Sequence, residues 1–370
     1  MTEIKRIVLS GGGTGGHIYP ALALYQVIKA KYPEVECLYV GSKKGLEADI
    51  VAKEGLAFQS VEIQGLKRSL SLENLKTAWL MLTSVHKAKK ILRDFKPDVV
   101  IGTGGYVCAP VLYAASRLGI PSLIHEQNSV AGVTNKFLSR FVNRIATCFE
   151  EVKSDFKGQE SKIILTGNPR GQEVVATPKM DTILSEQFQL DDQVPTVLVF
   201  GGSRGAPAIN QAAIEAIPSF AGQDYQVIVA TGRVHYDELR QSLKEELPAN
   251  VRLVPYIDNM PSLLRQIKLV VGRSGATSLT ELTALGLPSI LVPSPYVTNN
   301  HQEHNAMALV NHGGARMIKQ ADLTATSLVE TIQELMADPE NLEKMARSAY
   351  ELGIRDASDR LVQVLEEICK

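Results

Sequence analysis

The sequence predicts an α/β protein made of two Rossmann-like, doubly wound domains, each a parallel sheet covered by helices. Short β-branched runs alternate with helical stretches in the first half of the chain, and the same alternation starts again near Thr196. Most of these runs end in glycine or polar residues, as strands do when they lead through a tight turn into a helix. The length of 370 residues also favours two hydrophobic cores over one.

The expected strands can be placed in order along the chain. The first half carries them in KRIVLS, VECLYVG, PDVVIGTGG and PSLIHEQN, with a helix over residues 19–31 after the first. The second half carries them in TVLVFGGSRGA, QVIVATG, VRLVPYI, KLVVGRSGA and PSILVPSP. The polar stretch GNPRGQEVVATPKMD, residues 167–181, contains two prolines and is expected to be a linker. Three helical segments from about Ala325 close the chain.

Composition narrows the class of protein. With 45% hydrophobic and 21% charged residues the chain is expected to be globular. It lacks the run of about 20 apolar residues that a membrane-spanning helix needs, and it does not begin with the apolar segment of a signal peptide. The four cysteines form no CxxC pair, so we expect incidental thiols in a reducing compartment.

Charge is divided unevenly between the two halves. Residues 1–167 carry 22 Lys and Arg against 15 Asp and Glu, whereas residues 168–370 carry 17 against 25. We therefore expect only the first half to meet a polyanion, either a nucleic acid or an anionic membrane.

Three glycine clusters follow expected strands, at residues 11–17, 102–106 and 201–206. Glycine lets backbone N–H groups approach a phosphate, and a helix N-terminus adds partial positive charge. Each cluster alone is explained by a tight turn, but three at equivalent strand ends favour a diphosphate ligand. Because such ends line one edge of each sheet, we expect the clusters along one crevice between the domains.

The first cluster nearly fits two other nucleotide motifs. Its GxGxxG spacing indicates a dinucleotide-dependent oxidoreductase only if the second strand ends in an acid, and here Val40 is followed by Gly-Ser-Lys-Lys. It also has Walker A spacing, but His17 stands where that motif needs a lysine, so we exclude a P-loop.

Two further stretches carry polar residues at strand ends: HEQN at residues 125–128 and RSGATSLTE at residues 273–281. Glu281 fits a carboxylate that binds ribose hydroxyls, but Ser278 and Glu281 also have capping-box spacing. His301 and His304 lie three apart with neither a third ligand nor an HExxH frame, so we expect polar contacts and no metal site.

The motifs GGTGGH, GGYV, HEQN, GNP, GGSRGA and RSGATSLTE, in this order, resemble the MurG-type transferases of peptidoglycan synthesis. That family adds N-acetylglucosamine from UDP-N-acetylglucosamine to the 4-hydroxyl of the muramoyl sugar of undecaprenyl-diphosphate-linked N-acetylmuramoyl-pentapeptide (lipid I). The resemblance implies a GT-B architecture, in which two Rossmann-like domains face a cleft. Residues 1–167 would form the acceptor and membrane-facing domain, 168–345 the donor domain, and 346–370 a helix crossing back.

The resemblance also implies the surroundings of the enzyme: no cofactor, no nucleic acid, and a peripheral position on the cytoplasmic face of the cell membrane during cell wall synthesis. A GT-B transferase with another acceptor is the alternative. Donor contacts would come from Thr14, Gly15, Gly16, Asn128, Arg170, Ser203, the Ile257 backbone, Ala276, Thr277, Ser278, Leu279, Thr280, Glu281 and Gln302. Two positions depart from the family pattern, because Arg170 follows GNP at once and His301 replaces one of two paired glutamines.

Sugar transfer with inversion needs a base for the acceptor hydroxyl and compensation for charge on the leaving diphosphate. His17 is the first candidate base, because histidine accepts protons near neutrality. Glu126 and Tyr106 are the alternatives. The glycine clusters and a helix N-terminus would stabilise the diphosphate.

Residues 66–93 predict a basic amphipathic helix that lies on an anionic membrane. Its apolar stripe comprises Leu72, Leu75, Trp79, Leu82 and Val85, and its basic residues are Lys67, Arg68, Lys76, Lys87, Lys89, Lys90 and Arg93. The alternative is an ordinary domain helix whose apolar face packs inward, and part of the stripe must do so.

Overall fold

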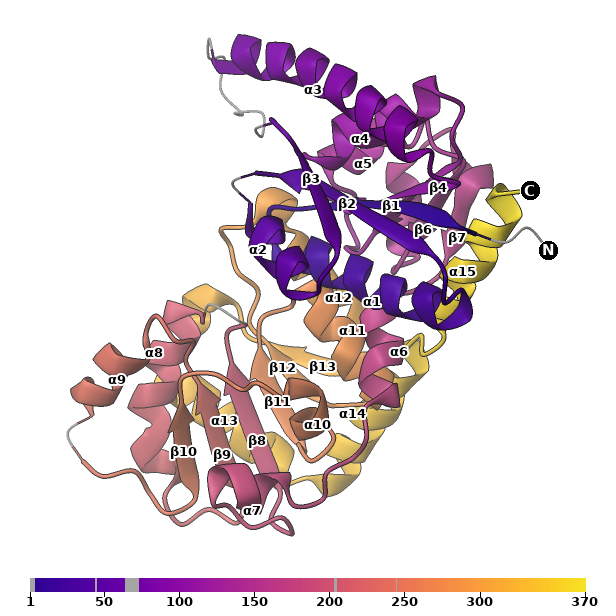
Figure 1. Cartoon of the computed structure of the whole chain (residues 1–370). Coiled ribbons are helices and arrows are strands. Elements are labelled where there is room, and N and C mark those ends of the chain that lie inside the picture. Colours follow the sequence, from indigo (N-terminus) through magenta and orange to yellow (C-terminus); the bar gives the residue numbers. More distant parts are fainter. Residues whose placement is uncertain (1–3, 44, 64–72, 203–204, 244) are drawn as a thin grey trace. The chain divides into compact units, whose positions relative to one another are not determined.

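The computed structural model describes residues 4–43, 45–63, 73–202, 205–243 and 245–370. The chain divides into two compact units (Figure 1). Unit 1 contains residues 1–172 together with 356–370, and unit 2 contains residues 173–355.

Unit 1 is built on a parallel sheet that has seven strands among the described residues. The spatial order is β3 (Ala57–Val61), β2 (Glu36–Ser42), β1 (Arg6–Gly11), β4 (Val99–Gly104), β5 (Ser122–Glu126), β6 (Arg144–Thr147) and β7 (Ile163–Leu165). Its helices are α1 (Gly15–Lys31), α2 (Leu46–Lys53), α3 (Glu73–Phe95), α4 (Cys108–Arg117), α5 (Val133–Leu138) and α15 (Ala357–Ile368). The strand order reverses direction between β1 and β4, which makes that edge the topological switch point.

Unit 2 repeats the plan with six parallel strands in the part of the chain described. Their order is β10 (Val251–Val254), β9 (Gln226–Ala230), β8 (Thr196–Phe200), β11 (Leu269–Gly272), β12 (Ser289–Leu291) and β13 (Ala315–Met317). Its helices are α7 (Ile183–Phe188), α8 (Pro207–Ala216), α9 (Tyr236–Ser242), α10 (Met260–Leu264), α11 (Ala276–Leu285), α12 (His301–Val310), α13 (Ala325–Met336) and α14 (Pro339–Leu352). Its switch point lies between β8 and β11.

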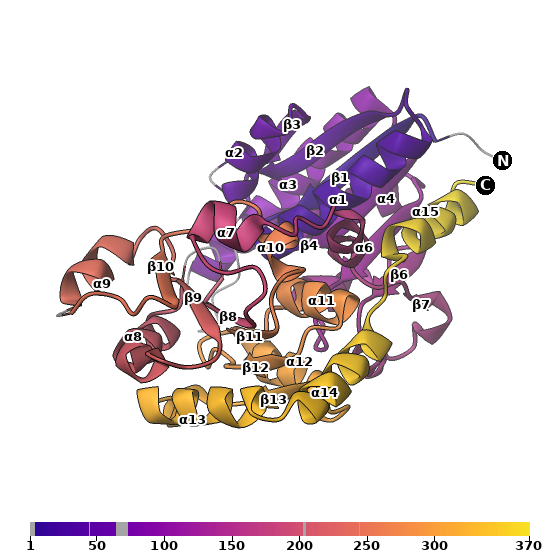
Figure 2. The ribbon, with the colours of Figure 1, turned by 90° about the horizontal axis from the view of Figure 1, so that it is seen from below.

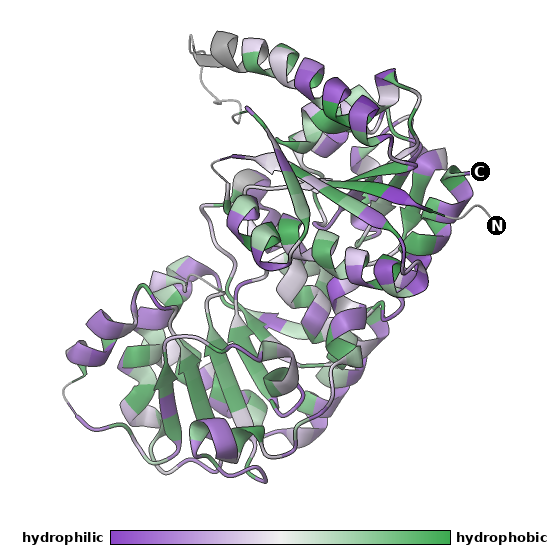
Figure 3. Cartoon of the chain, viewed as in Figure 1, coloured by the Kyte–Doolittle hydropathy of each residue, from purple (hydrophilic) through white to green (hydrophobic). Residues whose placement is uncertain are grey.

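The apolar runs of the sequence form buried strands of both sheets. Figure 3 shows hydrophobic residues along the strands and hydrophilic residues on the outer sides of many helices. Helices α13 and α14 cover one face of the second sheet (Figure 2), where Leu328 and Ile332 are fully buried against it. Burying a leucine or isoleucine of this kind stabilises the fold by about 1.5–3 kcal/mol.

Helix α15 returns to unit 1 after the whole of unit 2. It packs beside α1 and β6, and Leu361, Val362, Val364 and Leu365 belong to the same apolar cluster as β1 and α1. The hydrophobic core of unit 1 therefore includes a segment that is distant in sequence.

The prediction of two parallel α/β sheets is confirmed, as are the strand runs named above and the three closing helices. The stretch 167–181, expected to be a linker, contains the boundary between the units at residues 172 and 173, and α6 (Pro169–Ala176) occupies its first half. Pro169 is the first residue of that helix, a position where proline loses no hydrogen bond.

Candidate active site

The first two glycine loops meet at the switch point of unit 1. The first joins β1 to α1 and the second joins β4 to α4, and Gly12 N donates to Gly104 O at 3.2 Å. Gly105 has φ +86°, and a Cβ there would stand 2.3 Å from the carbonyl oxygen of Gly12. Only glycine fits this contact, so the close approach of the two loops depends on it.

A buried carboxylate holds the first loop from its inner side. Glu47, in the first turn of α2, accepts hydrogen bonds from the amide and hydroxyl of Ser42 at 2.9 and 2.6 Å and from Gly13 N at 3.3 Å. A Cβ on Gly12 would lie 2.5 Å from a Glu47 oxygen. One N–H of the loop is thus directed to Glu47 and away from any ligand. The residue also faces inward, so it is not the ribose-binding acid that an oxidoreductase needs.

His17 is the third residue of α1 and lies where the two loops meet. Thr103 Oγ1 donates to the His17 carbonyl at 2.6 Å, and the ring packs over Gly104, where a Cβ would stand 2.6 Å from Nδ1. His17 Nδ1 lies 3.1 Å from Gln127 Oε1. The ring is half-buried and held by contacts from two neighbouring strands.

The other two candidate bases occupy different surroundings. Tyr106 is 36% exposed and lies beside the first loop, with its Cε1 3.9 Å from where a Cβ on Gly13 would be. Glu126 is 1% exposed and accepts four hydrogen bonds, from Asn128 N, Asn128 Nδ2, Gly132 N and Asn135 Nδ2. A carboxylate offers about four acceptor sites, so Glu126 has none left for an acceptor hydroxyl and instead shapes the loop after β5.

The remaining candidates in unit 1 surround the same loops. Thr14 is exposed and precedes α1, and Gly15 and Gly16 form its first turn. Asn128 is half-buried in the loop that Glu126 holds. Arg170 is half-buried in the first turn of α6, where its N–H donates to Asn168 Oδ1 at 3.1 Å.

In unit 2 Ile257 follows β10, residues 276–281 follow β11, and Gln302 lies at the start of α12 after β12. Ser203 lies outside the described residues. Helix α11 begins at Ala276 after the N-cap Gly275, whose lack of a side chain excludes a capping box. The capping explanation for Glu281 is therefore wrong, and the residue lies in the second turn of α11, 8% exposed.

The side chains of α11 differ in how far the protein itself engages them. Leu279 is 1% exposed and packs in the interior, while Thr280 Oγ1 donates back to Ala276 O at 2.8 Å. Thr277 and Ser278 are half-buried. Leu279 can therefore line a ligand site only through its backbone, whereas Thr280 Oγ1 can still accept a hydrogen bond.

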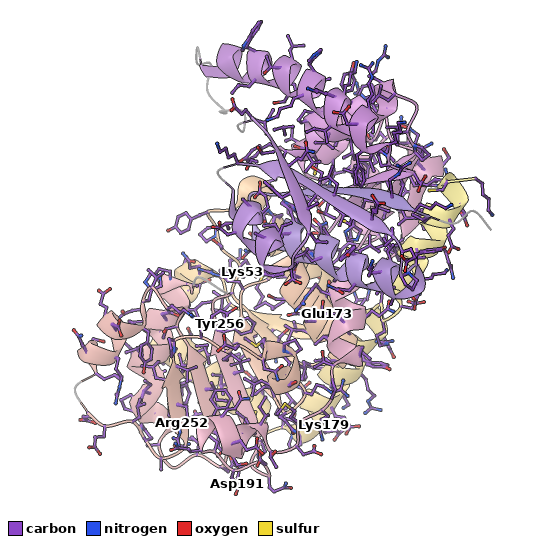
Figure 4. The ribbon with its side chains drawn as sticks, viewed as in Figure 1. Lys53, Glu173, Lys179, Asp191, Arg252 and Tyr256 are labelled. Carbon is purple, nitrogen blue, oxygen red and sulfur yellow. The ribbon has the colours of Figure 1, made fainter. Side chains whose placement is uncertain are left out.

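Two other segments lie near the carboxyl ends of the second sheet's strands. Gln302 Oε1 accepts from Ser294 N at 2.8 Å, so this bond engages the amide oxygen and leaves the NH₂ group out of it. Ile257 is 5% exposed, and its neighbour Tyr256 stacks under the guanidinium of Arg233 at 4.8 Å. In Figure 4 Tyr256 lies at the carboxyl end of the second sheet and Asp191 at the opposite end. Tyr256 was not predicted from the sequence, where an aromatic residue after a strand has no distinctive signal.

His301 is half-buried and His304 exposed at the start of α12. Among the described residues, no three His, Cys, Asp or Glu side chains gather in a way that could hold a metal ion.

The comparisons with known proteins agree with this geometry. Residues 7–147 match the glycosyltransferase family 28 N-terminal domain, and residues 196–361 match the glycosyltransferase family 28 C-terminal domain. A solved structure of Acinetobacter baumannii MurG is 28% identical with a TM-score of 0.79, covering 98% of this chain and 99% of that one. The chain is thus a glycosyltransferase whose two α/β domains are those of the GT-B architecture.

Close relatives define the particular family. The UDP-N-acetylglucosamine–N-acetylmuramyl-(pentapeptide) pyrophosphoryl-undecaprenol N-acetylglucosamine transferase of Lactiplantibacillus plantarum is 54% identical over 366 residues, which is 99% of this chain and all of the relative. The enzyme of that name from Listeria monocytogenes is 52% identical over the same lengths. The chain belongs to this family of N-acetylglucosamine transferases. The predicted resemblance is confirmed, and the oxidoreductase alternative is wrong.

Fold alone would not have settled the activity. A UDP-GlcNAc 2-epimerase from Neisseria meningitidis shares the fold with a TM-score of 0.67 at 17% identity, covering 98% of this chain and 100% of that one.

No helix in the described part of the chain is both long and apolar enough to cross a bilayer.

Proposed function

We propose that this chain transfers N-acetylglucosamine from UDP-N-acetylglucosamine to the muramoyl 4-hydroxyl of N-acetylmuramyl-(pentapeptide) pyrophosphoryl-undecaprenol, lipid I, and so forms lipid II. The observation that carries the proposal is identity above 50% along the whole chain with transferases of that name. Residues 1–167 would bind the acceptor and residues 168–345 the donor.

The proposed chemistry is an inverting displacement. The acceptor oxygen forms a bond to the anomeric carbon while the bond from that carbon to the diphosphate oxygen breaks, and UDP leaves with the electron pair. His17 takes the hydroxyl proton, because it lies between the two glycine loops and is not fully buried. Glu126 is not our candidate, since its four hydrogen bonds occupy it.

The donor is proposed to bind at the carboxyl ends of the second sheet's strands. Glu281 would accept from the ribose hydroxyls, Ile257 would meet the uracil through its backbone, and the Gln302 amide would donate to the sugar. Charge on the diphosphate would be balanced by backbone N–H groups of the glycine loops and by a helix N-terminus.

We further propose that unit 1 lies on the cytoplasmic face of an anionic membrane through the side of α3, α4 and α5. Trp79 and Leu82 on α3 are 66% and 68% exposed, although Ala88, Ile91 and Leu92 of that helix are buried in the core. Exposed Lys87, Lys90 and Arg93 follow on the same helix. Leu72 of the predicted apolar stripe and the basic residues Lys67 and Arg68 lie outside the described residues, as do the side chains of Leu75 and Lys76.

A second exposed apolar group lies next to α4. Phe137 and Phe141 are 41% and 37% exposed and contact each other and Tyr113, with ring centroids 5.0–6.1 Å apart. This group was not predicted from the sequence, although the four-residue spacing of the two phenylalanines beside Lys136 and Arg140 was a usable signal. Exposed aromatic rings beside basic residues fit the interface of an anionic bilayer.

The test is UDP release from UDP-N-acetylglucosamine with and without a lipid I analogue. We expect release to depend on the analogue and to fall by about 10²–10⁴-fold in His17→Ala, with little change in donor affinity. His312→Ala, which changes an exposed histidine of unit 2, is the matched control and should keep wild-type turnover. Near-normal turnover in His17→Ala would remove His17 from the chemistry, and release independent of the analogue would contradict the acceptor.

A further inference from the structure

A chain of hydrogen bonds inside unit 1 links His17 to a second, buried histidine. His17 Nδ1 lies 3.1 Å from Gln127 Oε1, and Gln127 Nε2 lies 2.9 Å from His125 Nδ1. His125 Nε2 in turn lies 2.8 Å from Gly167 O. Gln127 and His125 are 2% and 1% exposed, so solvent does not compete for these bonds.

The orientation of the Gln127 amide follows from its neighbours. Its nitrogen lies 2.8 Å from Thr103 O and 3.0 Å from His125 O, besides the ring nitrogen of His125. Carbonyl oxygens can only accept, so the group facing them must be the NH₂. The amide oxygen therefore faces His17.

The protonation of His125 is settled by the same reasoning. Its Nε2 faces the carbonyl oxygen of Gly167, so that nitrogen carries a hydrogen. The Cys148 sulfur lies 3.4 Å from the same nitrogen. Burial lowers the pKa of His125, which favours the neutral ring. A neutral ring protonated at Nε2 has its lone pair at Nδ1, where the Gln127 NH₂ donates.

Only one placement of the ring hydrogens of His17 completes this chain of hydrogen bonds. Gln127 Oε1 is an acceptor, so His17 Nδ1 must donate a hydrogen to it. This holds for the neutral ring and for the protonated ring alike, so Nδ1 keeps its hydrogen throughout. Proton exchange is then confined to Nε2, for which the described residues provide no hydrogen-bond partner.

We propose that Gln127 is a positioning residue that holds His17 in the tautomer with hydrogen on Nδ1 and the lone pair on Nε2. The catalytic consequence rests on the proposed function, in which His17 takes the acceptor proton. A glutamine suits this place because its amide donates on one side and accepts on the other without titrating. Neither oxygen of an ionised glutamate could donate to Thr103 O.

The tautomer is measured directly by ¹H–¹⁵N correlation of the ring nitrogens in the full chain labelled at histidine, at a pH where His17 is neutral. The chain has 7 histidines, and the His17 signals are those that disappear in His17→Ala. We expect a proton-bearing Nδ1 and a lone-pair Nε2 in the wild type. Gln127→Met removes the acceptor at similar length and should shift His17 toward the Nε2–H tautomer.

Kinetics distinguish positioning from a purely structural role. Gln127→Met should lower kcat by about 10–100-fold with KM for UDP-N-acetylglucosamine changed less than about twofold, because the lone pair is misplaced. In the His17→Ala background, Gln127→Met should add little further loss.

An unchanged His17 tautomer in Gln127→Met would overturn the proposal, as would an equal loss of kcat with and without His17. If Gln127→Met does not fold, Gln127→Asn withdraws the acceptor by one carbon and supports the same comparison. A wild type with the expected tautomer but no transfer to the lipid I analogue would contradict the proposed function and leave the Gln127 assignment standing.

Discussion

The exposed apolar side chains of α3 allow a quantitative test of membrane contact. A tryptophan buries roughly 150–250 Å² when fully covered, so a ring that is 66% exposed leaves about 130 Å² for lipid to cover. Leu82, at 68% exposed, adds about 100 Å². At about 25 cal/mol per Å², and with roughly half of this area reaching the acyl region, Trp79→Ala/Leu82→Ala should weaken vesicle binding by about 2–4 kcal/mol. That corresponds to roughly 30-fold to 1,000-fold in the partition coefficient.

The assay is co-sedimentation with vesicles of phosphatidylglycerol and phosphatidylcholine. Val234→Ala, which removes a 76% exposed apolar side chain from unit 2, is the matched control and should bind as the wild type does. Trp79 is the only tryptophan in the chain, so its emission should shift to the blue with anionic vesicles and less so with neutral ones. High salt should weaken the shift by screening Lys87 and Lys90.

Two results would refute this reasoning about α3. One is a double variant that binds anionic vesicles as tightly as the wild type. The other is Trp79 emission that lipid leaves unchanged. Turnover with a water-soluble acceptor analogue should survive the double substitution, which separates loss of membrane contact from loss of the fold.

Three further predictions follow from individual contacts. Glu281→Ala should weaken UDP-N-acetylglucosamine binding by about 1–3 kcal/mol in calorimetry, whereas the exposed-surface control Glu330→Ala should not; equal affinities would exclude a ribose contact. Transferase activity should survive EDTA, and its abolition with recovery by Mg²⁺ or Mn²⁺ would contradict charge balance by backbone N–H groups. Burial lowers the pKa of His125 from 6.5, so the unfolded chain takes up that proton at higher pH than the folded chain does. The free energy of unfolding should therefore fall as pH drops below about 6.5, and His125→Asn should flatten that slope in urea titrations; identical slopes would contradict it.

The strand-and-helix plan could be predicted because parallel strands buried on both faces are continuous apolar runs with glycine at their carboxyl ends. The short strands β3, β6, β7 and β13 were missed, since three to five residues carry little pattern of their own. The helix α6 was also missed, because two prolines and a glycine outweighed its short apolar segment.

The candidate site was predictable at the level of motifs but not of individual contacts. Glu47 lies outside every glycine cluster, and its bond to Gly13 depends on where α2 begins. Gln127 stands between two predicted residues of HEQN, yet its link to His17 joins positions 110 apart and appears only when β1, β4 and β5 lie side by side. Glu126 is the opposite case: its residue type predicts a catalytic base, but in the structure four hydrogen bonds occupy its carboxylate.

The return of α15 to the first sheet has a consequence for synthesis on the ribosome. The final helix of unit 1 is translated only after residues 173–355 of unit 2. At about 5–20 residues per second, this interval lasts roughly 10–40 s. Throughout it, the surface that later receives Leu361 and Leu365 lacks its cover, making the nascent first unit a substrate for chaperones. Unit 2 is continuous in sequence, so it can finish folding while the older half of the protein still waits for its last helix.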